Sequence, residues 1–213
     1  GSLSTLQIGE ASYLSASAET PVVADFRVAD LAVGGQGAPL ATFFHLVAFQ
    51  EFIKKHPICV HNLGGISNVS YFRQGSLSSF QKSGQKNILS FDTGPANMLI
   101  DLMVQKISKG KKKRDDGGQW AASGIIHHKL IQDWLTHPFL KRTPPKSCGR
   151  EEFGEVFLDL ISRQLKNISE KDQLATVTEL TALSVAQAYK NFLPKLPPLS
   201  IVAGGGAQNS HLM

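Results

Sequence analysis

Four clusters of polar and glycine residues each come directly after an apolar, strand-like run, and no other feature of this 213-residue chain constrains the fold as strongly. The clusters begin at Asp25, Asn62, Asp92 and Gly204. Helical patterns separate the strand-like runs in the second half of the chain, and this alternation indicates an α/β fold. Because ligands of α/β folds bind beyond the carboxyl ends of strands, the pattern predicts a ligand site built from these clusters.

Apolar periodicity predicts the elements that connect the clusters. Strands are expected at 21–24, at 58–60 and 61–72 as a hairpin around Gly64 and Gly65, at 87–91 and at 199–203. Helices are expected at 40–52, 98–107, 125–135, 153–165 and 172–192. Loops are predicted at 73–86, 109–116 and 143–151, and a turn that opens a helix is predicted at 92–97.

Composition is that of an intracellular globular protein. Hydrophobic residues make up 42% and charged residues 18%, which is enough apolar material for a packed core. No run approaches the roughly 18 apolar residues of a membrane helix, so no membrane partner is expected. Two cysteines, Cys59 and Cys148, cannot build a disulfide framework, and we therefore expect a reducing compartment, the cytoplasm.

The net charge of +5 has its main local source in the run of Lys and Arg at 111–114. A run of this kind is usually a solvated loop tip. A patch that binds phosphate or nucleic acid is the alternative. No aromatic residues alternate with the basic ones and no nucleic-acid-binding module surrounds them, so we do not expect a nucleic-acid partner.

Two glycine runs are candidates for phosphate binding. Gly64 and Gly65 in the predicted hairpin, and the three glycines that begin at Gly204, would let backbone N–H groups approach an anion. The second run could also let a flat ring lie against the backbone. Neither run has the spacing of a Walker motif or of a Rossmann fingerprint, and a tight turn is an equally good interpretation of each run alone.

Two carboxylates follow predicted strands. Asp92 could hold a hydrated Mg²⁺ near phosphates, and it could also cap the helix that follows. Asp25 could act as a general base, although an ion pair with Arg27 is the simpler interpretation from these residues alone. No His, Cys or Glu set has zinc spacing, and no Gly-x-Ser-x-Gly motif occurs.

Six segments, in order, resemble the anhydro-N-acetylmuramic acid kinase family. They are TLQIGEAS with VVADFRVADLAVGGQGAPL, HNLGGISNVS, FDTGPANMLID, WAASG, PPKSCGREEF and VAGGGAQNSHLM. The likeness runs from Thr5 to Met213. Each segment is weak alone, but their joint occurrence in this order is highly specific.

The resemblance implies a fold and an activity. The family belongs to the actin-like superfamily of sugar kinases and chaperone ATPases, with two ribonuclease-H-like α/β domains and ATP between them. Its members open the 1,6-anhydro ring of anhydro-N-acetylmuramic acid with water and phosphorylate O6 from MgATP, giving N-acetylmuramic acid 6-phosphate for cell-wall recycling. The resemblance therefore implies ATP and Mg²⁺ as cofactors and a small amino sugar as substrate. Homodimerisation of a full-length parent is a further expectation.

The resemblance also implies roles for individual residues. Asp25 falls on the family's catalytic aspartate, a base that activates water. The hairpin NLGGISN resembles the second phosphate-binding element, and GGGAQN resembles the adenosine-binding element. The implied contacts are Arg27, Gly35, Gln36 and Gly37 to the sugar, Asn62, Gly64, Gly65 and Asn68 to phosphate, Gly204, Gly205, Gly206 and Asn209 to adenosine, and Asp92 to Mg²⁺.

The chain departs from the family pattern in several places. The Gly-Thr-x-x-Asp-Gly hairpin that opens family members does not occur, and neither does the stretch that follows GGGAQN. We therefore expect an internal fragment, inactive alone, in which residues 1–57 end a first domain and 58–213 form most of a second. Arg114 and Gly117 stand where the family usually has Tyr and an acid. A non-catalytic nucleotide- or sugar-binding relative and a kinase of another sugar are the alternative functions.

Overall fold

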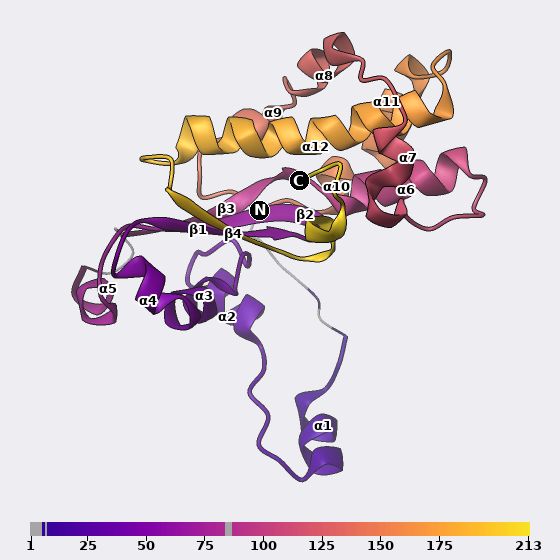
Figure 1. The fold of residues 1–213 in the computed structure, drawn as a ribbon. Coiled ribbons are helices and arrows are strands. Elements are labelled where there is room, and N and C mark those ends of the chain that lie inside the picture. The colour runs from indigo at the N-terminus through magenta and orange to yellow at the C-terminus, as the bar shows by residue number, and fades with distance from the viewer. Residues whose placement is uncertain (1–5, 7, 84–86) are drawn as a thin grey trace.

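A four-stranded mixed sheet forms the centre of the computed structural model, which describes residues 6, 8–83 and 87–213. The strands are β1 (Ile58–Leu63), β2 (Ile66–Phe72), β3 (Ile88–Pro95) and β4 (Leu199–Ala203), in the spatial order β3-β2-β1-β4. β2 pairs antiparallel with β1 and β3, whereas β4 runs parallel to β1. Helices cover both faces of the sheet (Figure 1), so the predicted α/β class is confirmed.

The predicted hairpin is confirmed, and the third strand is longer than predicted. β1 and β2 pair from Ile58 opposite Phe72 to Leu63 opposite Ser67. β3 continues past residue 91 because its pairing with β2 runs on until Ile66 faces Pro95. The predicted turn at 92–97 is therefore wrong for residues 92–95, which are strand.

The larger helical layer covers one face of the sheet and is built on the long helix α12 (Glu170–Phe192) (Figure 1). The Ser169 hydroxyl caps α12 by accepting a hydrogen bond from the Asp172 N–H at 3.3 Å. The remaining helices of this layer are α6 (Asn97–Ile107), α7 (Gln119–Ala122), α8 (His128–Trp134), α9 (Pro138–Lys141), α10 (Arg150–Phe153) and α11 (Glu155–Gln164). Their apolar side chains form the main core. No helix in the described part of the chain is long and apolar enough to cross a membrane.

The helices predicted in this layer form with changed boundaries. Those predicted at 98–107 and 172–192 match α6 and α12 closely, and the strand predicted at 199–203 matches β4. The helix predicted at 125–135 begins later, at His128. The helix predicted at 153–165 is broken at Gly154, where a Cβ atom would meet the backbone oxygen of Arg150. Arg150 also begins α10, so the loop predicted at 143–151 ends two residues early.

A smaller layer covers the opposite face with α3 (Thr42–Ala48), α4 (Gln50–Ile53) and α5 (Leu77–Ser83). The helix predicted at 40–52 is confirmed as two short helices. The loop prediction for 73–86 is wrong where α5 forms, because Phe80 is buried with its ring centroid 6.4 Å from that of Phe72. Residues 84–86 of that predicted loop lie outside the described residues.

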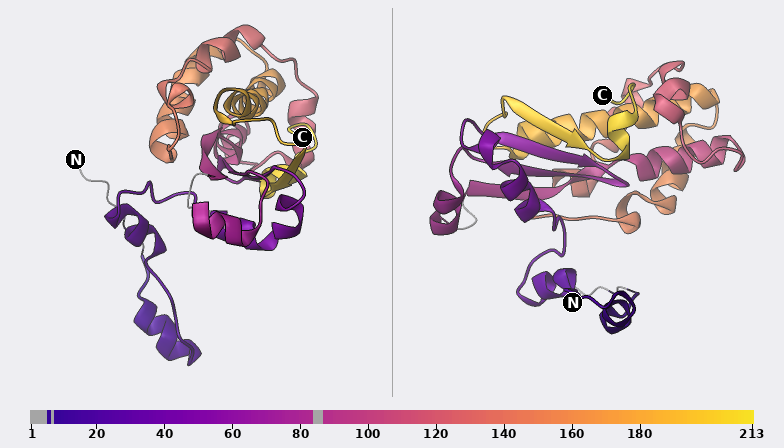
Figure 2. Two further views of the ribbon diagram at one scale, coloured as in Figure 1. Left: turned by 90° about the vertical axis from the view of Figure 1, so that its left-hand side faces the viewer. Right: turned by 60° about the horizontal axis from the view of Figure 1, so that its bottom comes forward.

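An arm that carries α1 (Ala11–Ala18) and α2 (Phe26–Ala32) extends from the side of the small layer (Figure 2). The strand predicted at 21–24 is wrong, because these residues are exposed and pair with no described strand. Val23, for example, is 76% exposed. An extended segment becomes a strand only when a neighbour takes up its backbone hydrogen bonds. α1 likewise buries none of its residues.

Candidate functional site

The parallel pairing of β4 with β1 brings two glycine turns together at one edge of the sheet. Asn62 lies opposite Ala203, so the turn after β1 and the turn after β4 leave the sheet side by side. A Cβ atom on Gly204, whose φ is 87°, would lie 2.6 Å from the backbone oxygen of Leu63. A Cβ atom on Gly206 would lie 2.6 Å from the Leu63 Cβ. The two turns can approach this closely only because these positions are glycine.

The first turn of α6 fixes the glycine turn of the hairpin. The backbone N–H groups of Asn97 and Met98 donate to the backbone oxygens of Gly64 and Gly65 at 3.0 and 3.1 Å. The Asn97 side-chain amide donates to the Leu63 oxygen at 2.9 Å. These bonds occupy donors that a helix start normally leaves free. The hairpin turn is therefore rigidly seated on α6, and Asp92 does not cap this helix.

A cavity of about 240 Å³ lies where the turn after β4 meets α6 and the loop before α7. Its polar walls include Asn97 and Asp101 from α6, Arg114 from the loop, and Gly205 and Gln208 from the turn. The predicted adenosine element thus opens onto a cavity that also includes α6.

The side chain of Asn209, a predicted adenosine contact, holds the end of the same turn. Asn209 is buried, and its Oδ1 accepts hydrogen bonds from the N–H groups of His211 and Leu212, both at 3.1 Å. Gly118 lies against it, and a Cβ atom there would overlap the Asn209 carboxamide. Asn209 lines the cavity, and its side-chain oxygen already accepts hydrogen bonds from the protein backbone.

Three predicted site residues lie in one row across the sheet. Asn62 on β1 is opposite Asn68 on β2, and Asn68 is opposite Asp92 on β3. Residues paired in this way share a face of the sheet, so two amides and a carboxylate lie side by side. The two asparagines are partly exposed, whereas Asp92 is buried. Strand register therefore assembles residues that are thirty positions apart in the chain.

Asp92 is held by the loop that precedes α10. Its Oδ2 accepts a hydrogen bond from the Cys148 N–H at 2.9 Å, and its own N–H donates to the Lys146 oxygen at 3.0 Å. Burial raises the pKa of Asp92 to about 6, although the Cys148 bond and the positive charges of Arg27 and Lys146 oppose the rise. The structure thus maintains a poorly solvated carboxylate at this end of the row.

Lys146 is a buried cation beside that carboxylate. Its Nζ donates to the backbone oxygens of Phe139 and Leu140 at 3.2 and 3.3 Å. It also lies 4.7 Å from the ring centroid of Phe139 and 4.5 Å from that of Phe192, within the range of cation–π contacts. Burial lowers the pKa of Lys146 to about 8.

The glycine loop of the arm reaches this region. The Arg27 guanidinium donates to the Gly37 oxygen, and the Gly37 N–H donates to the Asp30 carboxylate at 2.7 Å. The Gln36 backbone oxygen accepts a hydrogen bond from the Ser147 hydroxyl at 3.3 Å. The predicted sugar-binding loop is therefore attached to the loop that holds Asp92.

Asp25 lies at the start of α2 and is exposed, with a left-handed backbone (φ 64°, ψ 21°). The simple ion pair with Arg27 does not form, because no oxygen of Asp25 lies within 4.0 Å of a nitrogen of Arg27. Gly35 lies against Asp30, and a Cβ atom there would overlap the Asp30 carboxylate. Within the arm, Asp30 therefore makes the polar contacts, whereas the Asp25 carboxylate makes no hydrogen bond or ion pair with the described residues.

A buried hydrogen-bonded chain crosses the other face of the sheet. His61 contacts the Ser67 hydroxyl at 2.6 Å and the Tyr189 hydroxyl at 2.9 Å, and Ser67 in turn bonds to Thr93. Burial lowers the pKa of His61 to about 4, so the imidazole is neutral at pH 7. These hydrogen bonds connect β1, β2 and β3 to α12.

Sequence reasoning missed Asp101, Lys146 and Ser147. A usable signal existed for Asp101, because it follows Asn97 by four residues and so shares its face of a helix. Lys146 and Ser147 belong to a loop segment, and nothing in the sequence showed that this loop returns to β3. No group of three or more His, Cys, Asp or Glu side chains able to hold a metal occurs in the described residues.

Glycine turns at the ends of adjacent parallel strands, a polar cavity beside them and a row of amides ending in a carboxylate are typical of α/β proteins that bind phosphorylated ligands. The comparisons with known proteins agree with that class. The family model for anhydro-N-acetylmuramic acid kinase matches residues 2–213. The chain belongs to the anhydro-N-acetylmuramic acid kinase family.

Curated relatives carry the same family name. Those from Crocosphaera subtropica and Synechocystis are 43% and 44% identical to this chain over 210 and 208 residues. A relative from Cyanothece is 40% identical over 210 residues. These matches cover 97–98% of this chain but only 52–54% of each relative. The chain thus spans about half the length of the curated relatives it matches, which fits the expected fragment.

The structure gives a physical reason for one departure from the family pattern. Gly117 has φ 65° and ψ 6°, a conformation that glycine, asparagine and aspartate adopt most readily. The acid usual at this position therefore suits the same backbone. Arg114, the second departure, pairs with Asp116 at 2.7 Å on the surface beside the cavity. The turn keeps its shape without the usual side chain.

Proposed function

We propose that this chain is part of an ATP-dependent kinase that opens the 1,6-anhydro ring of anhydro-N-acetylmuramic acid and phosphorylates O6. The product is N-acetylmuramic acid 6-phosphate. Family membership supports the substrate and the reaction. The observation that carries the proposal is the meeting of the two glycine turns, one after each of the parallel strands β1 and β4.

In this proposal the nucleotide lies along that sheet edge. Gly204, Gly205 and Gly206 would carry the adenosine, because a backbone without side chains admits a flat group. Gly64 and Gly65 would bind phosphate oxygens through backbone N–H groups. Asn62 and Asn68, partly exposed in the row beside the turn, would add amide donors.

Asp92 fits a role toward Mg²⁺ that accompanies ATP. One carboxylate oxygen of Asp92 accepts a hydrogen bond from the Cys148 N–H, and the other accepts none from the described residues. A single carboxylate beside amide oxygens suits an ion that keeps several water and phosphate ligands. Bound Mg²⁺ would neutralise charge on the phosphates.

We assign the base role to Asp25. In the proposed reaction Asp25 takes a proton from water, the resulting hydroxide bonds to the anomeric carbon, and the bond from that carbon to O6 breaks. O6 then bonds to the γ-phosphorus as ADP leaves. The uncommitted carboxylate of Asp25 and the link from Gln36 to the loop that holds Asp92 support this placement. Arg27, Gly35, Gln36 and Gly37 would border the sugar.

The domain organisation is also a proposal: residues 1–57 end a first ribonuclease-H-like domain, and 58–213 form most of a second. Large exposed apolar side chains support it, because most of them precede residue 58. They are Leu6, Ile8, Tyr13, Leu14, Val22, Val23, Phe26, Val28, Val33, Leu40, Phe43, Phe44, Val47 and Phe52. Such a concentration of exposed apolar side chains is unusual on the surface of a complete soluble domain. Homodimerisation remains a prediction from the resemblance, and a cytoplasmic location remains a prediction from the small number of cysteines.

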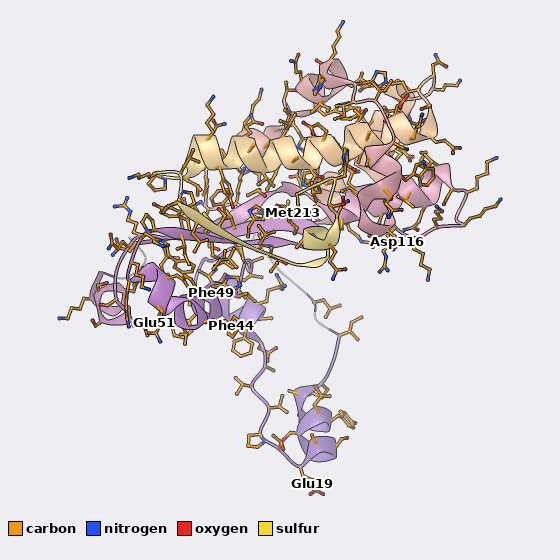
Figure 3. The ribbon with its side chains drawn as sticks, in the orientation of Figure 1. Glu19, Phe44, Phe49, Glu51, Asp116 and Met213 are labelled. Atoms are coloured by element: carbon orange, nitrogen blue, oxygen red, sulfur yellow. The ribbon has the colours of Figure 1, made fainter. Side chains whose placement is uncertain are left out.

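The test uses a full-length parent protein. Asp25→Asn should abolish turnover of anhydro-N-acetylmuramic acid, a loss of at least a hundredfold, while MgATP affinity stays within about twofold. Glu19→Gln is the matched control, because Glu19 is an exposed carboxylate at the tip of the arm (Figure 3). Retained turnover in Asp25→Asn would remove the base role. Phosphorylation of free hexoses without turnover of the anhydro sugar would point to a kinase of another sugar.

A further inference from the structure

Asp101 is the one acidic wall residue of the 240 Å³ cavity that the described part of the chain leaves without a hydrogen bond or ion pair. It lies on α6, one helical turn after Asn97, and is partly buried. A desolvated carboxylate without a partner costs folding free energy. Such groups concentrate at binding sites, where a ligand supplies the missing partner.

The other two carboxylates of the wall are already engaged. Both oxygens of Asp115 accept hydrogen bonds, from the N–H groups of Trp120 at 2.9 Å and Ala121 at 2.8 Å. Asp116 pairs with Arg114. The Asn97 amide donates to a backbone oxygen. Among the described residues, Asp101 is thus the one carboxylate of this cavity that has no donor.

The charges around Asp101 favour a neutral donor over a metal ion. Burial raises the pKa of Asp101 to about 6, and the positive charge of Arg114 opposes the rise. The neighbouring carboxylates are engaged, as described above, so a divalent cation would find one free carboxylate and a nearby guanidinium. Hydroxyl groups can donate to a carboxylate without adding charge, and vicinal hydroxyls can occupy both of its oxygens.

We propose that Asp101 binds the ribose hydroxyls of the nucleotide. This inference rests on the proposed function and adds a contact from α6 to the site. Gly205 lines the same cavity, and the nearest atom to a Cβ there would be the Asn97 amide nitrogen at 3.3 Å. A nucleoside that lies on the glycine turn therefore has its sugar within the cavity that Asp101 lines.

Calorimetric titration of this chain with ATP and with 2′,3′-dideoxy-ATP tests the inference. Asp101→Asn should weaken ATP binding about ten- to hundredfold, because a charged acceptor is replaced by a neutral one. The same variant should leave the affinity for dideoxy-ATP unchanged, since that nucleotide has no hydroxyls to lose. Asp133→Asn is the matched control, because Asp133 is exposed on α8 and lines no part of the cavity.

Two results would overturn the inference alone. Asp101→Asn with unchanged ATP affinity would show that no ribose contact exists. Equal weakening of both nucleotides would place Asp101 against another part of the ligand. Failure of the unsubstituted chain to bind either nucleotide would overturn the proposed nucleotide site as well. Thermal melting of Asp101→Asn provides the check on folding, and we expect no loss of stability because the buried charge is removed.

Discussion

The carboxylates of the site differ in how well the protein solvates them. Asp115 accepts two backbone hydrogen bonds and caps α7, whereas Asp92 accepts one and Asp101 accepts none from described groups. Burial raises the pKa of both Asp92 and Asp101 to about 6. Each therefore makes folding less favourable at pH 7 than at acid pH, and a bound ligand would recover part of this cost.

The stability of the chain should record the burial of Asp92. Its pKa is about 6 in the folded state and near 4 in the unfolded state, so the folded state binds more protons between these values. Its stabilising contribution is full below about pH 4 and is lost as the pH rises through 6. Urea unfolding measures this effect. The difference in unfolding free energy between the unsubstituted chain and Asp92→Asn should change with pH by an amount on the order of 2 kcal/mol.

Comparison with Asp92→Asn cancels the opposite effect of His61, whose pKa is lowered to about 4 in both proteins. A difference in unfolding free energy that is constant from pH 4 to 7 would contradict the account of Asp92.

Lys146 predicts a second pH effect, in alkaline solution. Its pKa is about 8 in the folded state and near 10.4 in the unfolded state, so the unfolded chain binds more protons between these values. Stability therefore rises with pH across this window. Lys146→Met keeps the length of the side chain among the rings of Phe139 and Phe192 and should remove the rise. Urea unfolding measures the effect. If the unfolding free energy changes with alkaline pH equally in both proteins, the prediction for Lys146 is contradicted.

At the scale of elements, the site depends on how the glycine turns pack against each other and against α6. Register places Asn62, Asn68 and Asp92 in one row, and α6 seats the glycine turn. The sequence identified Asn62 and Asp92 as candidates because each follows a strand-like run, and Asn68 through the family resemblance. The sequence could not show that these residues form a row, because the row depends on how the strands pair. It could not show the cavity either, because three separate segments of the chain form its walls.

The predictions of elements succeeded where local patterning decides the structure. α6, α12, the hairpin and β4 form as predicted. The errors have tertiary causes. α5 forms because Phe80 packs on Phe72, and β3 is extended by its pairing with β2. Residues 21–24 pair with none of the strands that the structure describes.

Two neighbouring glycines test the packing of the turn after β4. Gly206→Ala should lower the unfolding free energy by about 1–3 kcal/mol, because its Cβ would lie 2.6 Å from that of Leu63. Gly205→Ala is the stability control, since its Cβ would meet only the end of the Asn97 side chain at 3.3 Å. Thermal or urea unfolding measures both. Equal stability of the two variants would contradict the close approach of the turns.

At the scale of the whole molecule, the two halves of the surface differ. The layer built on α12 buries most of its apolar residues, whereas the arm and the outer side of α3 expose most of theirs. Phe43 and Phe44 on α3 are 73% and 68% exposed, and Figure 3 shows Phe44 on the outer side of the small layer. The proposed domain boundary after residue 57 accounts for this difference, since a completed first domain would cover these side chains.

A paired substitution tests this boundary. Phe43→Ser with Phe44→Ser should leave the melting temperature of this chain nearly unchanged and reduce its self-association in analytical ultracentrifugation. In a full-length parent the same substitutions should lower stability by several kcal/mol, because the side chains would then be buried. Equal effects in the two proteins would contradict the proposed domain organisation.

The central claim is that the glycine turns after β1 and β4 form one nucleotide site. A crystal structure of this chain with Mg²⁺ and a non-hydrolysable ATP analogue tests it most directly. The account predicts phosphate density against Gly64 and Gly65, and adenosine density against residues 204–206. A nucleotide bound elsewhere on the chain, or no density at these turns at a saturating concentration, would contradict it.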